Sequence, residues 1–153
     1  MSDDRTMTGG GYDGARGSGE TVGGRYRILR RIGEGGMGEV FEAWDTEAET
    51  VVALKRPPRE VWANPRGRDT FMREARIAER LRHPHIVAFL DLVDQGLGKP
   101  IYMVFEFIEG CNILEYLHKK QQPLEVQRAV SIAIQACQGL QYAHEQGIVH
   151  RDV

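Results

Sequence analysis

The sequence predicts an α+β protein in which a five-stranded antiparallel sheet with one helix is followed by further helices. The sheet is indicated by short runs of β-branched and aromatic residues between positions 26 and 106, separated by turns rich in glycine, proline or acidic residues. The second part is indicated by apolar residues that recur at intervals of three or four between positions 112 and 146. At 153 residues, the chain has the length of one ordinary domain.

Residues 1–24 are expected to form a tail. Eight of the chain's eighteen glycines lie in this stretch among Ser, Asp and Thr, with few apolar side chains. Such a composition buries too little apolar surface to offset the entropy lost on ordering, so we expect this stretch to be disordered. A plain flexible extension is the simpler interpretation, and a regulatory segment is the alternative.

Five segments are expected to form the sheet: residues 26–32, 39–44, 50–55, 86–93 and 101–106. In the first segment, Tyr26, Ile28 and Ile32 are expected to share the side that faces the core. Pro57 and Pro58 end the third segment, because proline cannot donate to a strand ladder.

A glycine-rich loop with the pattern G-x-G-x-x-G-x-V joins the first two strands, from Gly33 to Val40. Dinucleotide-binding proteins carry a similar pattern, but their loop opens into a helix. Here the loop opens into β-forming residues, so we expect a hairpin between antiparallel strands. Glycines leave backbone N–H groups unshielded beside a phosphate chain, and Lys55 on the next strand can add a positive charge. The alternative is a glycine-rich hairpin beside a surface lysine.

Residues 69–82 are expected to form an amphipathic helix that covers the sheet. The apolar residues at helical spacing are Phe71, Ala75, Ala78 and Leu81. Glu74 falls on the same stripe, where a carboxylate is costly unless it is paired. Lys55 is the expected partner because its strand belongs to the sheet beneath the helix. The alternative places Glu74 at the edge of the stripe, in solvent.

The second part of the chain is expected to contain a short helix over residues 112–120 and a long helix over residues 123–146. Pro123 suits the first turn of the long helix, and Gly147 suits its C-terminal end. Apolar residues form a broad stripe on the long helix, so it should be nearly surrounded by protein.

Three motifs in this order resemble the catalytic domain of a protein kinase. The family pairs a glycine loop of this pattern with a V-A-I-K strand, and the strand ending in Lys55 reads V-A-L-K. The tripeptide His150-Arg151-Asp152 resembles the opening of the kinase catalytic loop, H-R-D-L-x-x-x-N, with Val153 in the leucine place. The residue sequence of the glycine loop and the ending H-R-D-V are most similar to those of bacterial serine/threonine kinases of the eukaryotic type.

The resemblance covers the chain from about residue 26 to its last residue. It implies a kinase small lobe and hinge over residues 25–110 and part of a large lobe over residues 111–153. The implied reaction transfers the γ-phosphate of ATP to Ser or Thr hydroxyls of proteins. ATP and such proteins are therefore the implied partners.

The resemblance implies that Lys55, paired with Glu74, holds the nucleotide phosphates and that Asp152 accepts the proton of the substrate hydroxyl. In the family, Asn112 falls where a polar residue often contacts the ribose. The residues implied to bind the nucleotide are Ile32, Gly33, Glu34, Gly35, Gly36, Met37, Gly38, Glu39, Val40, Ala53, Lys55, Phe105, Glu106, Ile108 and Asn112.

The adenine position is implied by alignment with the kinase hinge. Phe105 takes the gatekeeper place, and the backbone of Glu106 and Ile108 would bond the adenine edge. Val40 and Ala53 would pack on the two faces of the base.

The sequence contains neither of the residues that bind Mg²⁺ in this family, the catalytic-loop Asn and the D-F-G Asp. Mg²⁺ is expected for the parent kinase, but we expect this chain by itself to transfer phosphate at no useful rate. We also expect the long helix to expose an apolar patch. A nucleotide-binding, pseudokinase-like interaction module and a non-functional truncation are the alternatives.

Composition narrows the possible partners. A net charge of −2 is too small to indicate nucleic acid or an anionic membrane as a partner.

Cys111 and Cys137 lie far apart and fit no disulfide framework or metal spacing, so the cytoplasm is the expected compartment. His83 and His85 flank a proline and also fit no metal spacing. No signal peptide or membrane-spanning run is expected.

Overall fold

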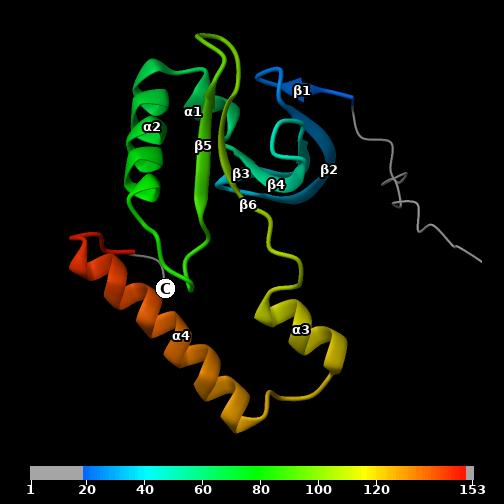
Figure 1. Ribbon diagram of the computed structural model, residues 1–153, viewed down its shortest axis with the longest axis vertical. Helices are drawn as coiled ribbons and strands as arrows, with labels where there is room; N and C mark the ends of the chain where they lie inside the picture. Colours follow the sequence, from blue (N-terminus) through cyan, green and yellow to red (C-terminus); the bar gives the residue numbers. More distant parts are fainter. Residues whose placement is uncertain (1–18, 151–153) are drawn as a thin grey trace, which may run out of the picture.

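The computed structural model describes residues 19–150. Figure 1 shows a sheet with α2 packed along one side and with α3 and α4 below it. The strands are β1 (Thr21–Val22), β2 (Tyr26–Gly35), β3 (Gly38–Asp45), β4 (Thr50–Arg56), β5 (Phe89–Asp94) and β6 (Ile101–Glu106). The helices are α1 (Arg59–Trp62), α2 (Pro65–Glu79), α3 (Ile113–Lys120) and α4 (Val126–Glu145).

The five predicted strands, β2 to β6, and the short strand β1 form one six-stranded antiparallel sheet with the order β1-β2-β3-β4-β6-β5, which confirms the predicted fold class. The short strand β1 is an addition at the edge beside β2. Its residues fall within the predicted tail, and that prediction is wrong for them, because Val22 is only 1% exposed and packs in the core. Residues 1–18, the rest of the predicted tail, lie outside the described residues.

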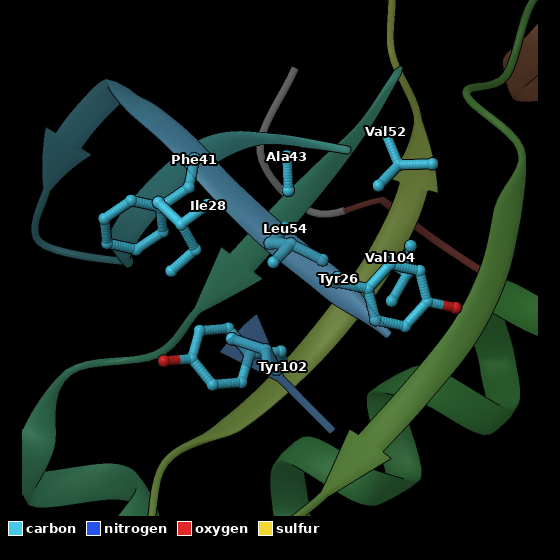
Figure 2. Packing of buried hydrophobic residues seen from close by; sticks show 9 residues of the cluster. Tyr26, Ile28, Phe41, Ala43, Val52, Leu54, Tyr102 and Val104 are labelled. Atoms are coloured by element: carbon cyan, nitrogen blue, oxygen red, sulfur yellow. The ribbon is translucent and has the colours of Figure 1, made fainter. Parts of the chain in front are cut away.

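The two faces of the sheet carry different cores. Figure 2 shows the core of the outer face, the face turned away from α2. Its buried residues are Val22, Tyr26, Ile28, Phe41, Ala43, Val52, Leu54, Tyr102 and Val104. On the inner face, Phe71 and Ala75 of α2 pack against Ile101 and Met103 of β6. The alternation of side chains along each strand therefore separates two apolar layers.

Irregular pairing in β2 changes which of its residues face the core. The register between β2 and β3 shifts between Ile28 and Arg30 and again between Arg31 and Gly33. Such bulges interrupt the two-residue alternation. The prediction that Ile32 faces the core is therefore wrong, since this side chain is 40% exposed.

The helix predicted over residues 69–82 begins four residues earlier and ends three residues earlier. Its N-cap is Asn64, whose side chain accepts a hydrogen bond from the backbone N–H of Arg66 at 2.9 Å, and Pro65 occupies the first helical position. Arg68 is buried and donates to the carboxylate of Asp94 and to the carbonyl of Lys99 (3.0 Å). These bonds attach α2 to the turn between β5 and β6.

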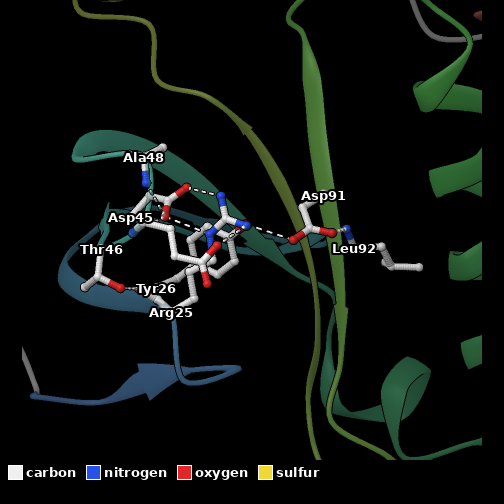
Figure 3. A network of polar contacts seen from close by, with 8 residues as sticks. Arg25, Tyr26, Asp45, Thr46, Ala48, Asp91 and Leu92 are labelled. Atoms are coloured by element: carbon white, nitrogen blue, oxygen red, sulfur yellow. Dashed lines mark hydrogen bonds and ion pairs between the residues drawn. The ribbon is translucent and has the colours of Figure 1, made fainter.

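A polar network closes the end of the sheet away from the glycine hairpin, as Figure 3 shows. The guanidinium of Arg25 donates to both carboxylate oxygens of Asp45, at 2.7 and 2.6 Å. Asp45 also accepts from the backbone N–H groups of Glu47 and Ala48, which fixes the turn after β3. The hydroxyl of Tyr26 donates to Asp91 at 2.8 Å and so connects β2 with β5.

The C-terminal half of α4 packs against the segment that follows α2, and its N-terminal half contacts α3, where Arg128 donates to the hydroxyl of Tyr116 at 3.0 Å. Gly139 and Ala143 are buried, and the ring of Tyr142 stacks on His83 with centroids 5.2 Å apart. Gly147 has a φ of +74° and ends the helix, while the N–H of Ile148 donates to the carbonyl of Ala143 at 2.9 Å.

The predicted burial of the long helix is wrong for this chain, and the predicted apolar patch is present. We name the exposed residues Val126, Val130 and Ile134 the α4 stripe; Val126 is 78% exposed. Within residues 19–150, no helix combines the length and apolar character needed to cross a membrane.

Candidate nucleotide-binding site

The glycine loop is a tight antiparallel hairpin, as predicted. Gly35 pairs with Gly38, which leaves Gly36 and Met37 at the tip. Gly38 has a φ of +105°, and a Cβ atom there would lie 2.0 Å from the carbonyl oxygen of Arg56. Only glycine fits this position, because the hairpin backbone touches the end of β4.

Strand pairing brings several of the predicted nucleotide-binding residues into one row on the inner face. Gly33 of β2 is opposite Val40 of β3, Val40 is opposite Lys55 of β4, and Lys55 is opposite Met103 of β6. Residues paired across antiparallel strands point to the same face. The row therefore places the backbone of the glycine loop, an apolar side chain and a lysine side by side.

A second row lies two residues further along each strand, on the same face. It joins Glu42, Ala53 and Phe105. The rings of Phe105 and Phe89 meet edge to face, with centroids 5.8 Å apart. Glu42 is buried, and its carboxylate pairs with Arg30 at 2.5 Å. Apart from this neutralised pair, the second row is apolar and is suited to a flat aromatic group.

A third row has the opposite orientation. Glu34, Glu39 and Arg56 are paired across β2, β3 and β4, and each is one residue away from a member of the first row. Their side chains therefore lie on the outer face. The structure does not place the side chains of Glu34 and Glu39 with the other predicted nucleotide-binding residues, because the hairpin strands alternate inward and outward positions.

A pocket of about 410 Å³ lies between the hairpin tip, β4 and α2. Gly36 and Met37 line it from the tip, Lys55 from β4, and Phe71 and Glu74 from α2. The pocket is therefore lined by both the glycine loop and Lys55, which the sequence predicts to bind phosphate.

Lys55 and Glu74 line this pocket without forming the predicted ion pair; within residues 19–150, no contact of 4.0 Å or less joins their charged atoms. Glu74 is exposed, as in the alternative stated above. The reason is the orientation of α2, which directs Phe71 and Ala75 at the sheet and leaves Glu74 roughly a quarter turn away.

The predicted hinge follows β6. The backbone N–H of Glu106 donates to the carbonyl of Ala88 at 3.0 Å, and its carboxylate accepts from the N–H of Ala88 at 2.7 Å. These bonds fix the end of β6 next to the second row. Ile108, two residues later, is exposed at the start of the connection to α3.

Asn112 has a structural role that the sequence analysis missed. It is the N-cap of α3, and its side-chain oxygen accepts from the backbone N–H of Glu115 at 2.8 Å. Its amide nitrogen donates to the carboxylate of Glu115 at 3.0 Å. An Asn followed three residues later by Glu at a helix start is a capping signal that the sequence already contained.

Asp152, the predicted base, lies outside the described residues. Within residues 19–150, no group of three His, Cys, Asp or Glu side chains is arranged to hold a metal ion.

A known protein family matches most of the chain. The sequence model of the family described as "Protein tyrosine and serine/threonine kinase" matches residues 26–153. The chain therefore belongs to the protein kinase family.

Two of the curated relatives are bacterial serine/threonine kinases. The chain is 40% identical over 130 residues to the serine/threonine-protein kinase PknE of Mycobacterium bovis and covers 22% of it. It is 37% identical over 134 residues to the probable serine/threonine-protein kinase SCO3848 of Streptomyces coelicolor and covers 20% of it. These matches include 85% and 86% of the chain, which spans about a fifth of the length of either relative.

Among solved structures, the kinase domain of Mycobacterium tuberculosis PknI superposes with a TM-score of 0.74 at 29% identity. The superposition covers 91% of this chain and 55% of that chain. The fold and the serine/threonine kinase resemblance predicted from the sequence are confirmed.

Proposed function

We propose that this chain is the ATP-binding part of a protein kinase that phosphorylates Ser and Thr hydroxyls of proteins. Residues 25–110 would form the small lobe and hinge, and residues 111–153 would form part of the large lobe. ATP, with Mg²⁺ in the complete kinase, is the phosphate donor. The cytoplasm, where ATP is plentiful and thiols such as Cys111 stay reduced, is the proposed compartment.

One observation carries the proposal: the row formed by Gly33, Val40 and Lys55 on the inner face of the sheet. The glycine backbone can approach phosphate oxygens, and the lysine supplies a charge within the same row. Next to it, Ala53 and Phe105 offer an apolar surface for the base. The two rows together thus offer polar groups to the phosphate end of a nucleotide and apolar groups to its base.

Each residue has a distinct task in the proposed reaction. Lys55 orients the phosphates, and the hairpin covers them, so that the transferred group is held in position. Asp152 accepts the proton of the substrate hydroxyl. Mg²⁺ supplies charge neutralisation at the phosphates when it is bound. Because the family's magnesium ligands are not in this sequence, we expect the 153-residue chain by itself to bind ATP without useful transfer.

The test is ATP binding by the 153-residue chain, measured by titration calorimetry. Lys55→Met should raise the Kd for ATP about tenfold or more, because charge-assisted contacts to phosphate are lost. Lys99→Met is the matched control, since Lys99 lies in the turn between β5 and β6 and its hydrogen bonds to Gly96 and Arg68 are made by its backbone, which the substitution keeps. Equal Kd values for the wild-type chain and Lys55→Met would contradict the proposed site.

A further inference from the structure

The outer face of the glycine hairpin carries a set of ion pairs that the nucleotide site does not use. The carboxylate of Glu39 accepts from two guanidinium nitrogens of Arg56, at 2.6 and 3.1 Å, and from Arg31 at 3.3 Å. Arg31 also pairs with Glu34 at 2.8 Å. Glu39 therefore connects β2, β3 and β4 close to the tip of the hairpin.

Arg56 is held from its other side by aromatic residues of the outer core. Its guanidinium lies 4.9 Å from the ring centre of Phe41 and donates to the hydroxyl of Tyr102 at 3.4 Å. Both rings are buried. Stacking and partial burial reduce the freedom of the arginine, so it is a fixed partner for Glu39 rather than a mobile surface charge.

The pair is placed directly behind the proposed site. Glu39 lies between Gly38 and Val40, and Arg56 follows Lys55, so each member is next in sequence to an inner-face residue. Because neighbouring side chains on a strand point to opposite faces, a fixed outward side chain also fixes the orientation of its inward neighbour. Hydrogen bonds from Arg56 and, to a smaller extent, from Arg31 lower the pKa of the Glu39 carboxyl group, as expected for a paired carboxylate.

We propose that Glu39 and Arg56 form a clamp that positions the glycine hairpin and Lys55 for nucleotide binding, without touching the nucleotide. The function of this clamp rests on the ATP site proposed above. Glu39 and Arg56 are thus positioning residues.

The sign of the change in ATP affinity distinguishes this positioning role from a direct electrostatic effect of the Glu39 charge on ATP. Removing the negative charge of Glu39 makes the region more positive, which by Coulomb attraction alone would strengthen the binding of the anionic ATP. Losing the clamp releases the hairpin and weakens binding. The two explanations predict opposite signs for the same substitution.

The experiment uses the 153-residue chain with two readouts: the Kd for ATP, and amide hydrogen exchange of residues 33–40 without nucleotide. Glu39→Ala should raise the Kd roughly fivefold or more and speed the exchange, because two charge-assisted bonds to Arg56 are lost. Glu39→Gln keeps an acceptor and should fall between Glu39→Ala and the wild-type chain. Glu47→Ala is the control, since Glu47 is an exposed partner of Arg25 (3.1 Å) at the opposite end of β3, and it should change neither readout.

An unchanged or lower Kd for Glu39→Ala would overturn the proposal, whatever happens to the exchange. If the wild-type chain binds no ATP, the proposed function fails, and the exchange measurement alone decides on the clamp. In that case, faster exchange of residues 33–40 in Glu39→Ala supports the clamp, and unchanged exchange overturns it.

Discussion

Apolar residues of the sheet are buried, whereas those of the α4 stripe are exposed. In the sheet, Leu54 and Val104 are fully buried in a core to which five of the paired strands contribute, from β1 to β4 and β6. In α4, Val130 and Ile134 are about half exposed although the helix is well formed. Regular secondary structure can therefore be complete where tertiary packing is not, because a helix makes its own backbone hydrogen bonds. The stability of this chain should come mainly from the sheet.

The largest expected effect is on the free energy of unfolding, when one large apolar side chain in each region is replaced by alanine. Leu54→Ala should lower the free energy of unfolding by about 2–5 kcal/mol, because it leaves a cavity in the outer core. Ile134→Ala in the α4 stripe should cost less than about 1 kcal/mol, since little buried area is lost. Urea denaturation followed by circular dichroism measures both values. Equal costs would mean that α4 is packed as tightly as the sheet.

The hairpin gives the next largest effect. Gly38→Ala should destabilise the chain by about 2–3 kcal/mol, because the new methyl group would collide with the backbone of Arg56 and φ is positive. Gly36→Ala is the control within the same loop, since a Cβ there would meet no atom within 4 Å. Thermal unfolding of both variants tests whether Gly38 packs against the backbone of β4. A harmless Gly38→Ala would show that the hairpin does not rest on β4.

A smaller effect is expected from pH at the other end of the sheet. Hydrogen bonds from Arg25 lower the pKa of Asp45 from its usual value of 3.8 to about 2. Because the folded pKa is lowered, the pair contributes its full stability above about pH 4 and loses it as the pH falls toward 2. The denaturation midpoint should therefore drop between pH 4 and pH 2, and less steeply for Asp45→Asn. Identical pH profiles for the wild-type chain and Asp45→Asn would contradict the role of this pair.

The smallest expected effect on stability comes from the α4 stripe itself. Val130→Lys should change the free energy of unfolding by no more than about 0.5 kcal/mol, because about half of the Val130 side chain is already exposed to water. It should nevertheless reduce self-association, since it divides an exposed apolar patch. Sedimentation velocity compares the self-association of Val130→Lys with that of the wild-type chain. A large loss of stability would show that this part of α4 is covered.

The sequence predicted the sheet well because its signals are local. The alternation of apolar residues and the turns between strands located five strands, and β6 has the predicted bounds of Ile101 and Glu106. The strand β1 was missed because two residues among glycines carry too little pattern, although the core needs Val22. The error at Ile32 arose from bulges, which the pattern of residue types does not reveal.

The candidate site was predicted as a region more accurately than as a set of contacts. The inward row of Gly33, Val40 and Lys55 follows from strand alternation, and the same rule applied to Glu39 would have placed it outward. The position of Glu74 depends on how α2 rotates against the sheet, which spacing alone does not determine. The role of Asp152 stays a prediction.

The most direct test of the nucleotide site compares the two faces of the same strands. Methyl groups of Val40 and Ala53 lie on the inner face, whereas those of Ala43 and Val52 belong to the outer core. In a methyl NMR titration of the 153-residue chain with ATP, we expect the signals of Val40 and Ala53 to shift and those of Ala43 and Val52 to stay in place. Equal shifts on both faces, or no shift at Val40 and Ala53 at saturating ATP, would contradict the account.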